Sequence, residues 1–421
     1  MKKNGIKETR DKGRFPSGNK TDDKSSEAGL LNAKIARSNA RAKTGTISNS
    51  SQRKSLLLVA LLFLIFLCLL VVVIYKMPDN MLTPAKSEET AELADFDLLI
   101  SFSRNEGSRY YPFGDHLVYL SQDKLELLNL NNEILFDQTL EFTRPVGIYN
   151  ADYFVAADRD SGKVIVLNRD NKQFELQLEG NFAGASFAGN KYISVIEENP
   201  NQPAFVHIVS LETGKISLTI QFFESGYPLA VCFSKDLTYF DVLLSNTAGS
   251  SLQPVVNRYD LAGRQTGQIM PQGYPYLYGS IQHDQADNVL IAAASHILAL
   301  NFEREEPLAE HSAGKIYQLV SDQQVSALSS NRVEGEISVV DWDSANGTFI
   351  DREVNLLNQI EQVTANQDLI AISHNNQLQL YNRKSHKIVL DQFLDSNILR
   401  IGILSDRLLL ITENGVKTLG F

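Results

Sequence analysis

Cysteine is scarce in this sequence, which has two cysteines among 421 residues. Cys68 lies in a long apolar run, so Cys232 is the only cysteine of the large part that follows. An intrachain disulfide within that part is therefore excluded. Secreted eukaryotic domains of this size are more often cross-linked, so the scarcity favours a protein of a bacterial cell envelope.

Motifs of common enzyme classes are absent as well. The chain has no G-x-S-x-G nucleophile elbow, no phosphate-binding loop and no H-E-x-x-H zinc motif. Its seven histidines are spread singly, whereas zinc needs three or four ligands that lie close together. We therefore expect no metal and no cofactor. The sequence contains no catalytic motif of these classes, but this does not exclude enzymatic activity.

Spaced acidic residues occur at 158–162 (DRDSG) and at 341–344 (DWDS). A calcium loop of the EF-hand type needs oxygen ligands at its first, third and fifth positions, glycine at the sixth and glutamate at the twelfth. Neither segment keeps that order. Because Asp and Gly suit tight turns, we interpret both segments as hairpin turns, with the single tryptophan, Trp342, in the second.

A long apolar run is the most informative feature that is present. Residues 56–75 read LLLVALLFLIFLCLLVVVIY and hold no charged side chain. As a helix with a rise of about 1.5 Å per residue, the run is about 30 Å long, the thickness of a bilayer's hydrocarbon core. We predict one transmembrane helix at 55–76, which contacts the lipid bilayer through residues 56–75.

The charges beside this run predict its orientation. Residues 1–54 carry 14 Lys and Arg against five Asp and Glu, whereas residues 76–95 carry two Lys. Because flanking cations stay in the cytoplasm, we predict a cytoplasmic amino terminus and an extracytoplasmic remainder. A cleavable signal peptide is the alternative, but its apolar region spans about 7–15 residues and ends in a small-x-small site, which is missing here. An uncleaved signal anchor in the cell membrane fits better.

The segment before the run is rich in Gly, Ser, Asn and Lys and has one aromatic residue, Phe15. It cannot bury enough apolar surface to offset the entropy lost on folding, so we expect a disordered basic tail at 1–54. Its net charge of +9 suits anionic lipids or nucleic acid, or else serves only to set the topology. Residues 77–95 are interpreted as a stalk.

The net charge changes sign after the tail. The whole chain carries −11, so residues 55–421 carry −11 minus +9, or −20. An acidic surface repels polyanions. We therefore expect no nucleic-acid partner for the extracytoplasmic domain.

From about residue 109 the chain repeats a unit of short alternating strands. The first unit reads HLVYL (116–120), KLELL (124–128) and ILF (134–136), with Asn131 and Asn132 in the last turn. The central strands of successive units carry anchor residues 35 to 50 positions apart, at Leu117, Phe154, Ile193, Phe240, Leu290, Val325, Leu369 and Leu408. Alternation of period two at this spacing is typical of propeller blades. A sandwich would not repeat in this way, and a helical solenoid would show a period of 3.6.

The two ends of the domain predict how the ring closes. The last unit has strands near 397–404, 408–412 and 415–420 but no outer strand. Residues 96–102 (FDLLISF) form an apolar strand without a partner of its own. Pairing this strand with the last unit would remove two open sheet edges.

This pairing completes the predicted fold. By alternation, Leu98, Ile100 and Phe102 should share the buried face of the added strand. We predict an all-β, eight-bladed β-propeller at residues 96–421. A seven-bladed ring is the alternative if the fourth or fifth unit is misread.

One turn carries a resemblance to a known family. Residues 209–216 read VSLETGKI, which resembles the turn Leu-Asp-x-x-Thr-Gly-Lys in the repeats of pyrroloquinoline-quinone-type propellers. The tryptophan that follows this turn in the family is replaced by Ser217 and Leu218. The resemblance implies the propeller fold. It does not extend to quinone chemistry, because the family's enzymes use a stacked tryptophan, calcium and a vicinal disulfide, and this chain has no Cys-Cys pair.

The order of the parts carries a second resemblance. A basic tail, one span and an acidic propeller resemble the membrane-anchored propeller proteins of Clostridia-like Gram-positive bacteria. This resemblance implies a location and no particular activity.

One connecting segment is aromatic where the others are polar. Residues 272–279 read QGYPYLYG and place Tyr274, Tyr276 and Tyr278 at alternate positions. Alternate residues of an extended segment share a face, so the three phenols are candidates for a recognition surface at the mouth of the channel. The alternative is that these rings pack between blades.

Together these features predict a non-catalytic binding or scaffold module of the bacterial cell envelope. Its partner would be an envelope protein or another extracytoplasmic component. A sensor or enzyme for a small envelope ligand or glycan, bound at the central channel, is the alternative. The fold by itself cannot decide between these functions.

Overall fold

The computed structural model describes residues 96–420 except 103–105, 201–202, 224–225, 322–323, 331–336, 353, 355 and 405. The predicted transmembrane helix at 55–76, the basic tail and the stalk lie outside the described residues. Within the described ranges, no helix is long and apolar enough to cross a membrane.

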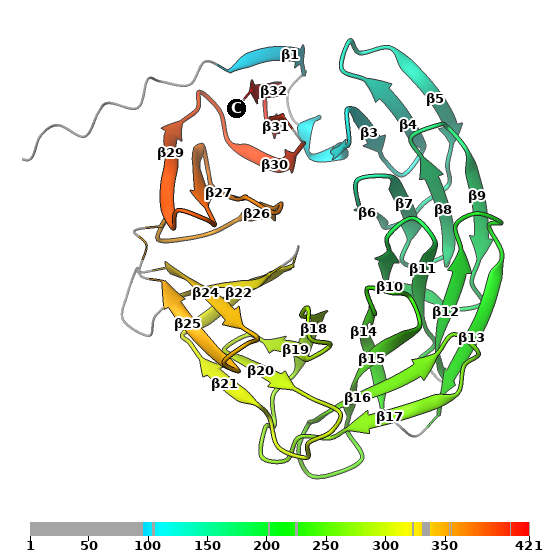
Figure 1. Ribbon diagram of the computed structural model, residues 1–421. Coiled ribbons are helices and arrows are strands. Elements are labelled where there is room, and N and C mark those ends of the chain that lie inside the picture. The colour runs from blue at the N-terminus through cyan, green and yellow to red at the C-terminus, as the bar shows by residue number, and fades with distance from the viewer. Residues whose placement is uncertain are drawn as a thin grey trace, which may run out of the picture. The chain divides into compact units, whose positions relative to one another are not determined.

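Eight four-stranded antiparallel sheets form the blades of a ring (Figure 1). Blades 1 to 4 consist of β2 Tyr110–Phe113, β3 His116–Leu120, β4 Lys124–Asn129, β5 Ile134–Thr139; β6 Pro145–Tyr149, β7 Tyr153–Asp158, β8 Lys163–Asn168, β9 Gln173–Gln177; β10 Asn181–Ala188, β11 Tyr192–Glu198, β12 Ala204–Ser210, β13 Ile216–Phe222; and β14 Tyr227–Phe233, β15 Tyr239–Asn246, β16 Gln253–Asp260, β17 Gln265–Ile269. Blades 5 to 8 consist of β18 Tyr278–His283, β19 Val289–Ala293, β20 His296–Leu300, β21 Ala309–Ser312; β22 Lys315–Ser321, β23 Val325–Ser330, β24 Ile337–Asp343, β25 Thr348–Arg352; β26 Gln362–Ala365, β27 Leu369–His374, β28 Gln377–Asn382, β29 Lys387–Phe393; and β30 Ile398–Ile403, β31 Arg407–Thr412, β32 Gly415–Gly420, β1 Asp97–Ser101. A short 3-10 helix, η2 Gly107–Arg109, precedes blade 1. The predicted eight-bladed propeller is confirmed, and the seven-bladed alternative is wrong.

The hydrophobic core lies between the blades. In blade 2, Phe154 and Ala156 pack toward blade 1, whereas Val155 and Ala157 pack toward blade 3. Alternate residues of one strand thus serve two different interfaces. The described residues form eight buried clusters, and each of the eight blade-to-blade interfaces holds one of them. Each blade is therefore covered on both faces by its neighbours.

Seven blades turn from their third to their fourth strand in the same way. In blade 1 the Asn129 side-chain oxygen accepts hydrogen bonds from the backbone N–H groups of Asn131 (3.0 Å) and Glu133 (2.9 Å). The residues that accept such a bond in the next six blades are Asn168, Ser210, Asp260, Asn301, Asp343 and Asn382. In blade 3 this turn belongs to the VSLETGKI segment at 209–216. There Gly214 has a φ of +67°, which glycine adopts without steric cost. Polar residues are therefore placed in these turns by backbone geometry.

The two acidic segments have different structures. Asp158 accepts backbone hydrogen bonds from Arg144 and Ser161 in a turn, as predicted. The prediction is wrong for Trp342, which belongs to strand β24. Its ring is buried between blades 5 and 6, and the indole N–H donates to the Asp284 carboxylate at 2.6 Å. Burial of this large ring extends the strand past the point where the acidic residues suggested a turn.

The ring closes as predicted, because β1 is the fourth strand of blade 8 and pairs with β32. In Figure 1 this amino-terminal strand lies beside the carboxyl-terminal strands of the same blade. Ile100 is buried and packs with Leu117 of blade 1. Phe102, just after β1, stacks on Tyr110 with ring centroids 4.3 Å apart. The added strand thus contributes apolar contacts to the joint between the last and first blades.

The predicted shared face of Leu98 and Ile100 is wrong. A β-bulge shifts the register between them, so that Leu98 lies opposite Lys417 and Ile100 lies opposite Val416. An inserted residue turns the side chain before it to the other side of the strand. Leu98 is accordingly 54% exposed.

Ile100 and Leu98 offer a matched test of ring closure. Replacing Ile100 with alanine removes buried contacts and should lower the free energy of unfolding by about 2–5 kcal/mol. Replacing the exposed Leu98 with alanine should change it by less than about 0.5 kcal/mol. Chemical denaturation of both full-length variants measures the difference. Equal losses would contradict the described packing of β1.

Candidate functional site

The strand order gives the ring two different faces. On one face the fourth strand of each blade ends and the first strand of the next begins, and the turns between second and third strands lie there too. We call this the crossover face. The opposite face carries the turns between first and second strands and between third and fourth strands.

Exposed apolar side chains gather on the crossover face at blade 4 and at the start of blade 5. We call this group the apolar rim, and its members are Phe223, Tyr227, Leu252, Tyr276 and Leu277. The other large apolar side chains that are exposed in the described chain belong to the outermost strands β1, β5, β13 and β29. A local group of exposed apolar side chains marks a binding site more often than the same side chains scattered singly over a surface.

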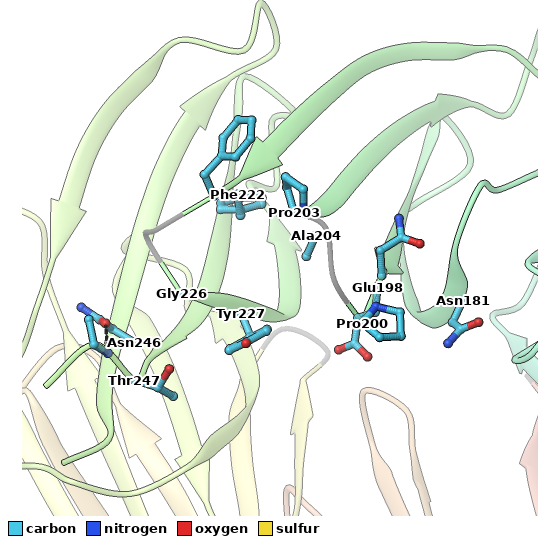
Figure 2. A pocket seen from close by; sticks show the side chains of 13 residues that line it. Asn181, Glu198, Pro200, Pro203, Ala204, Phe222, Gly226, Tyr227, Asn246 and Thr247 are labelled. Atoms are coloured by element: carbon cyan, nitrogen blue, oxygen red, sulfur yellow. Dashed lines mark hydrogen bonds between the residues drawn. The ribbon is translucent and has the colours of Figure 1, made fainter. Parts of the chain in front are cut away.

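A groove of about 800 Å³ adjoins the apolar rim between blades 3 and 4. Its lining residues are Asn181, Glu198, Asn199, Pro200, Pro203, Ala204, Phe222, Phe223, Gly226, Tyr227, Asn246, Thr247 and Ala248. In the view of Figure 2, the Tyr227 ring lies between Thr247 on one side and Glu198 and Pro200 on the other. The volume lies within the range of about 300–1,000 Å³ that is usual for ligand sites.

A buried polar group supports one wall of this groove. Glu197 accepts a hydrogen bond from the backbone N–H of Gly180 (2.8 Å) and one from the side chain of Asn199 (3.0 Å). Its other oxygen lies 2.9 Å from His207 Nε2, and His207 Nδ1 lies 2.9 Å from the Thr219 hydroxyl. Buried polar networks with all partners present hold their elements in one arrangement. The two loops at Gly180 and Asn199 are thereby tied to each other.

The other wall depends on a glycine. Gly226 has a φ of +112°, and a Cβ placed there would lie 2.6 Å from the carbonyl oxygen of Ser245. Only glycine fits such a position without a shift of the backbone. The next residue, Tyr227, begins β14 and projects its ring outward with 59% exposure. Phe223, across the same connection, is 71% exposed.

The structure separates the three predicted tyrosines. Tyr278 is 1% exposed in the core between blades 4 and 5, and Tyr274 is half-buried against the same core. Tyr276 is exposed and stacks on His296, with ring centroids 3.7 Å apart. The segment is bent rather than extended, because the Tyr276 N–H donates to the Tyr274 carbonyl at 2.9 Å. The expected common face is therefore wrong, and a recognition role remains a prediction for Tyr276 alone.

Sequence reasoning missed Phe223, Tyr227 and Leu252. The available signal was weak: the connection between the third and fourth units is flanked by aromatic residues, at Phe223 and Tyr227. Aromatics beside a strand are more often buried than exposed, and the sequence did not show that the Gly226 turn directs the ring outward.

Blades 4 and 5, which carry most of the apolar rim, are joined by a buried ionic network. Asp241 accepts two hydrogen bonds from Arg258, each 2.8 Å long, and lies 2.8 Å from His283 Nε2. The Arg258 guanidinium also lies 3.8 Å from the Tyr239 ring centroid and 3.9 Å from that of Phe302. Because His283 belongs to blade 5 and the other charged groups belong to blade 4, the network fixes one blade against the next.

His283 is held in its charged form. Burial lowers its pKa, but the hydrogen bond to the Asp241 carboxylate and the nearby Cys232 outweigh burial, and the pKa is raised to about 10. The geometry agrees, because Nδ1 donates to the Phe233 carbonyl at 3.0 Å while Nε2 donates to Asp241. With both nitrogens engaged, the imidazole cannot take a proton from the nearby thiol. The network of Asp241, Arg258 and His283 therefore has a structural role.

A second large cavity opens on the opposite face, around the axis of the ring. It measures about 1,120 Å³ and is lined by turns that include Asp115, Asn150 and Asn366. Its arginines are already paired, Arg169 with Asp152 and Arg407 with Asp406, each at 2.8 Å. Among the described residues, no group of three or more His, Cys, Asp or Glu side chains is placed to hold a metal ion.

A family model described as "Family of unknown function (DUF5711)" matches residues 95–421. The chain belongs to this family. No curated protein matches this DUF5711 member. Its fold is similar to that of Sqt1 from Saccharomyces cerevisiae, with a TM-score of 0.55, 10% identity, and coverage of 77% of this chain and 100% of Sqt1.

Two further solved structures are similar in fold. The Dos1 propeller matches with a TM-score of 0.53 and 9% identity, covering 77% of this chain and 95% of Dos1. BamB from Moraxella catarrhalis matches with a TM-score of 0.48 and 15% identity, covering 78% of this chain and 100% of BamB. Identities this low show the propeller fold alone.

The raised pKa of His283 predicts a pH dependence of stability. Its charged form stabilises the fold fully below the unfolded-state pKa of about 6.5, and that contribution is lost as the pH rises through about 10. The free energy of unfolding should therefore decline between about pH 7 and pH 10, and decline less steeply in His283→Gln. Denaturation at several pH values measures the slope.

His311 provides the control, because burial lowers its pKa. His311 is then uncharged above pH 7 in both the folded and unfolded states, so His311→Gln should keep the wild-type slope. An unchanged slope in His283→Gln would contradict the charged network.

Proposed function

We propose that this protein is a single-pass membrane protein of a Clostridia-like Gram-positive bacterium, with its propeller outside the cytoplasm. Residues 1–54 remain in the cytoplasm, residues 55–76 span the membrane and residues 77–95 lead to the propeller. The uncharged run at 56–75 and the excess of cations before it support this arrangement.

The propeller would act as a non-catalytic binding or scaffold module for an envelope protein or another extracytoplasmic component. The observation that carries this function is the apolar rim, five exposed apolar side chains gathered on one face. Aromatic side chains are enriched at protein interfaces, where they bury a large area on binding. Blades 4 and 5, which carry most of the rim, are joined to each other by the Asp241–His283 contact.

The position of β1 suits a membrane-tethered binding module. β1 begins at Asp97 on the opposite face and ends at Ser101, which pairs with Gly415 at the crossover face. The start of β1 is therefore on the face opposite to the apolar rim.

A second candidate is a sensor or enzyme for a small envelope ligand or glycan at the central channel. The cavity of about 1,120 Å³ on the opposite face favours it. A small molecule that co-purifies with the protein, or hydrolase activity that is lost in Asp115→Asn, would support this candidate over the scaffold.

Labelling of introduced cysteines tests the topology. Ser50→Cys should resist a membrane-impermeant maleimide in intact cells, whereas Ser385→Cys, in an exposed turn of blade 7, should react. Labelling of the unsubstituted protein, which contains Cys68 and Cys232, gives the background signal. The reverse pattern of labelling would overturn the proposed orientation.

Capture of envelope proteins by the full-length chain tests the binding role. Leu277→Asp places a charge in the apolar rim and should abolish the capture of a stoichiometric partner, because burying an unpaired charge is costly. Leu135→Asp changes another exposed leucine, on the outermost strand of blade 1, which is 40% exposed against 56% for Leu277, and should leave capture intact. If both variants lose the partner or both retain it, the rim is not the binding surface.

A further inference from the structure

The groove shares Phe223 and Tyr227 with the apolar rim, but its lining also contains polar side chains that the rim lacks. Among the described residues that line the groove, Glu198 is the one carboxylate, and there is no lysine or arginine. Its neutral polar side chains come from four separate strand ends and turns: Asn181, Asn199, Asn246, Thr247 and the Tyr227 hydroxyl. Amides and hydroxyls of this kind both donate and accept hydrogen bonds.

Several of these groups face the groove without an internal role. Within the described part of the chain, the side chains of Asn181, Thr247 and Tyr227 make no hydrogen bond to another residue. Asn246 uses its side-chain oxygen for the Ala248 N–H at 2.9 Å, which leaves its amide N–H₂. The polar groups that hold the fold together, by contrast, are buried one layer below at Glu197 and His207.

Phe223 and Tyr227 are the two exposed aromatic side chains among the three that line the groove. Phe223 and Tyr227 present flat apolar surface beside these amides and hydroxyls. A ligand that buries such a ring gains hydrophobic stabilisation. The ligand that matches both features has an apolar face and a rim of neutral donors and acceptors, which describes a pyranose ring.

We propose that this groove binds a neutral oligosaccharide segment of an envelope glycan. The C–H face of one sugar stacks on Tyr227, and its hydroxyls pair with Asn181, Asn246, Thr247 and Glu198. The volume of about 800 Å³ accommodates more than one sugar ring. The source of the glycan rests on the proposed extracytoplasmic location, whereas the binding chemistry does not.

Charge decides against two other ligand classes. A phosphorylated ligand would meet the Glu198 carboxylate, and the described lining residues include no cation to balance it. A lysine or arginine side chain of a protein could use Glu198 and an aromatic face, but it would leave the amides of Asn181 and Asn246 unmatched. A neutral polyhydroxyl ligand uses the whole lining.

Calorimetric titration of the full-length protein in detergent tests the proposal. The probes are chitotetraose, cellotetraose and maltotetraose, with tetralysine as the cationic comparison. At least one oligosaccharide should bind, and Tyr227→Ala should weaken its affinity about tenfold or more, the effect of losing one central aromatic contact. Phe393→Ala, which removes an aromatic ring that is 66% exposed on blade 7, should leave affinity within about twofold.

Glu198→Gln distinguishes the ligand classes, because it removes the charge and keeps a hydrogen-bonding group. Oligosaccharide affinity should change by no more than about threefold. Tetralysine binding that disappears in Glu198→Gln, without oligosaccharide binding by the wild type, would overturn the proposal in favour of a basic protein segment. Failure of all three oligosaccharides, or unchanged affinity in Tyr227→Ala, would also overturn it.

The outcome is separable from that of the proposed scaffold function. Leu277→Asp tests protein capture at the apolar rim and should not change oligosaccharide affinity, since Leu277 does not line the groove. Thermal unfolding should be unchanged in Tyr227→Ala, because its side chain is exposed.

Discussion

Closure of the ring is the constraint on which the rest of this structure depends. Each of the eight clusters of buried side chains in the described residues lies between two blades. A blade therefore buries both its faces only when it has a neighbour on each side. The strand β1 completes the last blade, and Ile100 packs across the final joint. Short antiparallel strands become a stable fold through this closure.

The closed ring then positions the candidate site. Polar networks hold neighbouring elements in place where apolar packing alone would allow sliding: Glu197 ties two loops of the groove, and Asp241 ties blade 4 to His283 of blade 5. Tyr227 lines the same groove as Asn199, whose loop Glu197 ties to Gly180. A surface held in this way is largely formed before a ligand arrives, which limits the ordering cost of binding.

Much of the fold could be predicted, because its signals are local. The second strands of blades 2, 3 and 4 begin at Tyr153, Tyr192 and Tyr239, where alternation and turn residues placed them. Prediction from the local sequence failed where contacts with other strands decide the structure. The bulge before Ile100 follows from pairing with β32, and Trp342 extends β24 because its ring fills the interface with blade 5.

The sequence by itself determined the repeat, the number of blades, their order and the strand that closes the ring, since period-two alternation and turn chemistry act over a few residues. Only the tertiary structure decided which side chains meet. Asn181, Glu198, Tyr227 and Asn246 line one groove because successive blades bring their strand ends to the same face. Tyr278 is buried while Tyr227 is exposed, although each begins the first strand of a blade. The backbone before each ring differs. It bends at Tyr276 before Tyr278, whereas Gly226 before Tyr227 has a positive φ and packs against the Ser245 carbonyl, a contact between residues far apart in sequence.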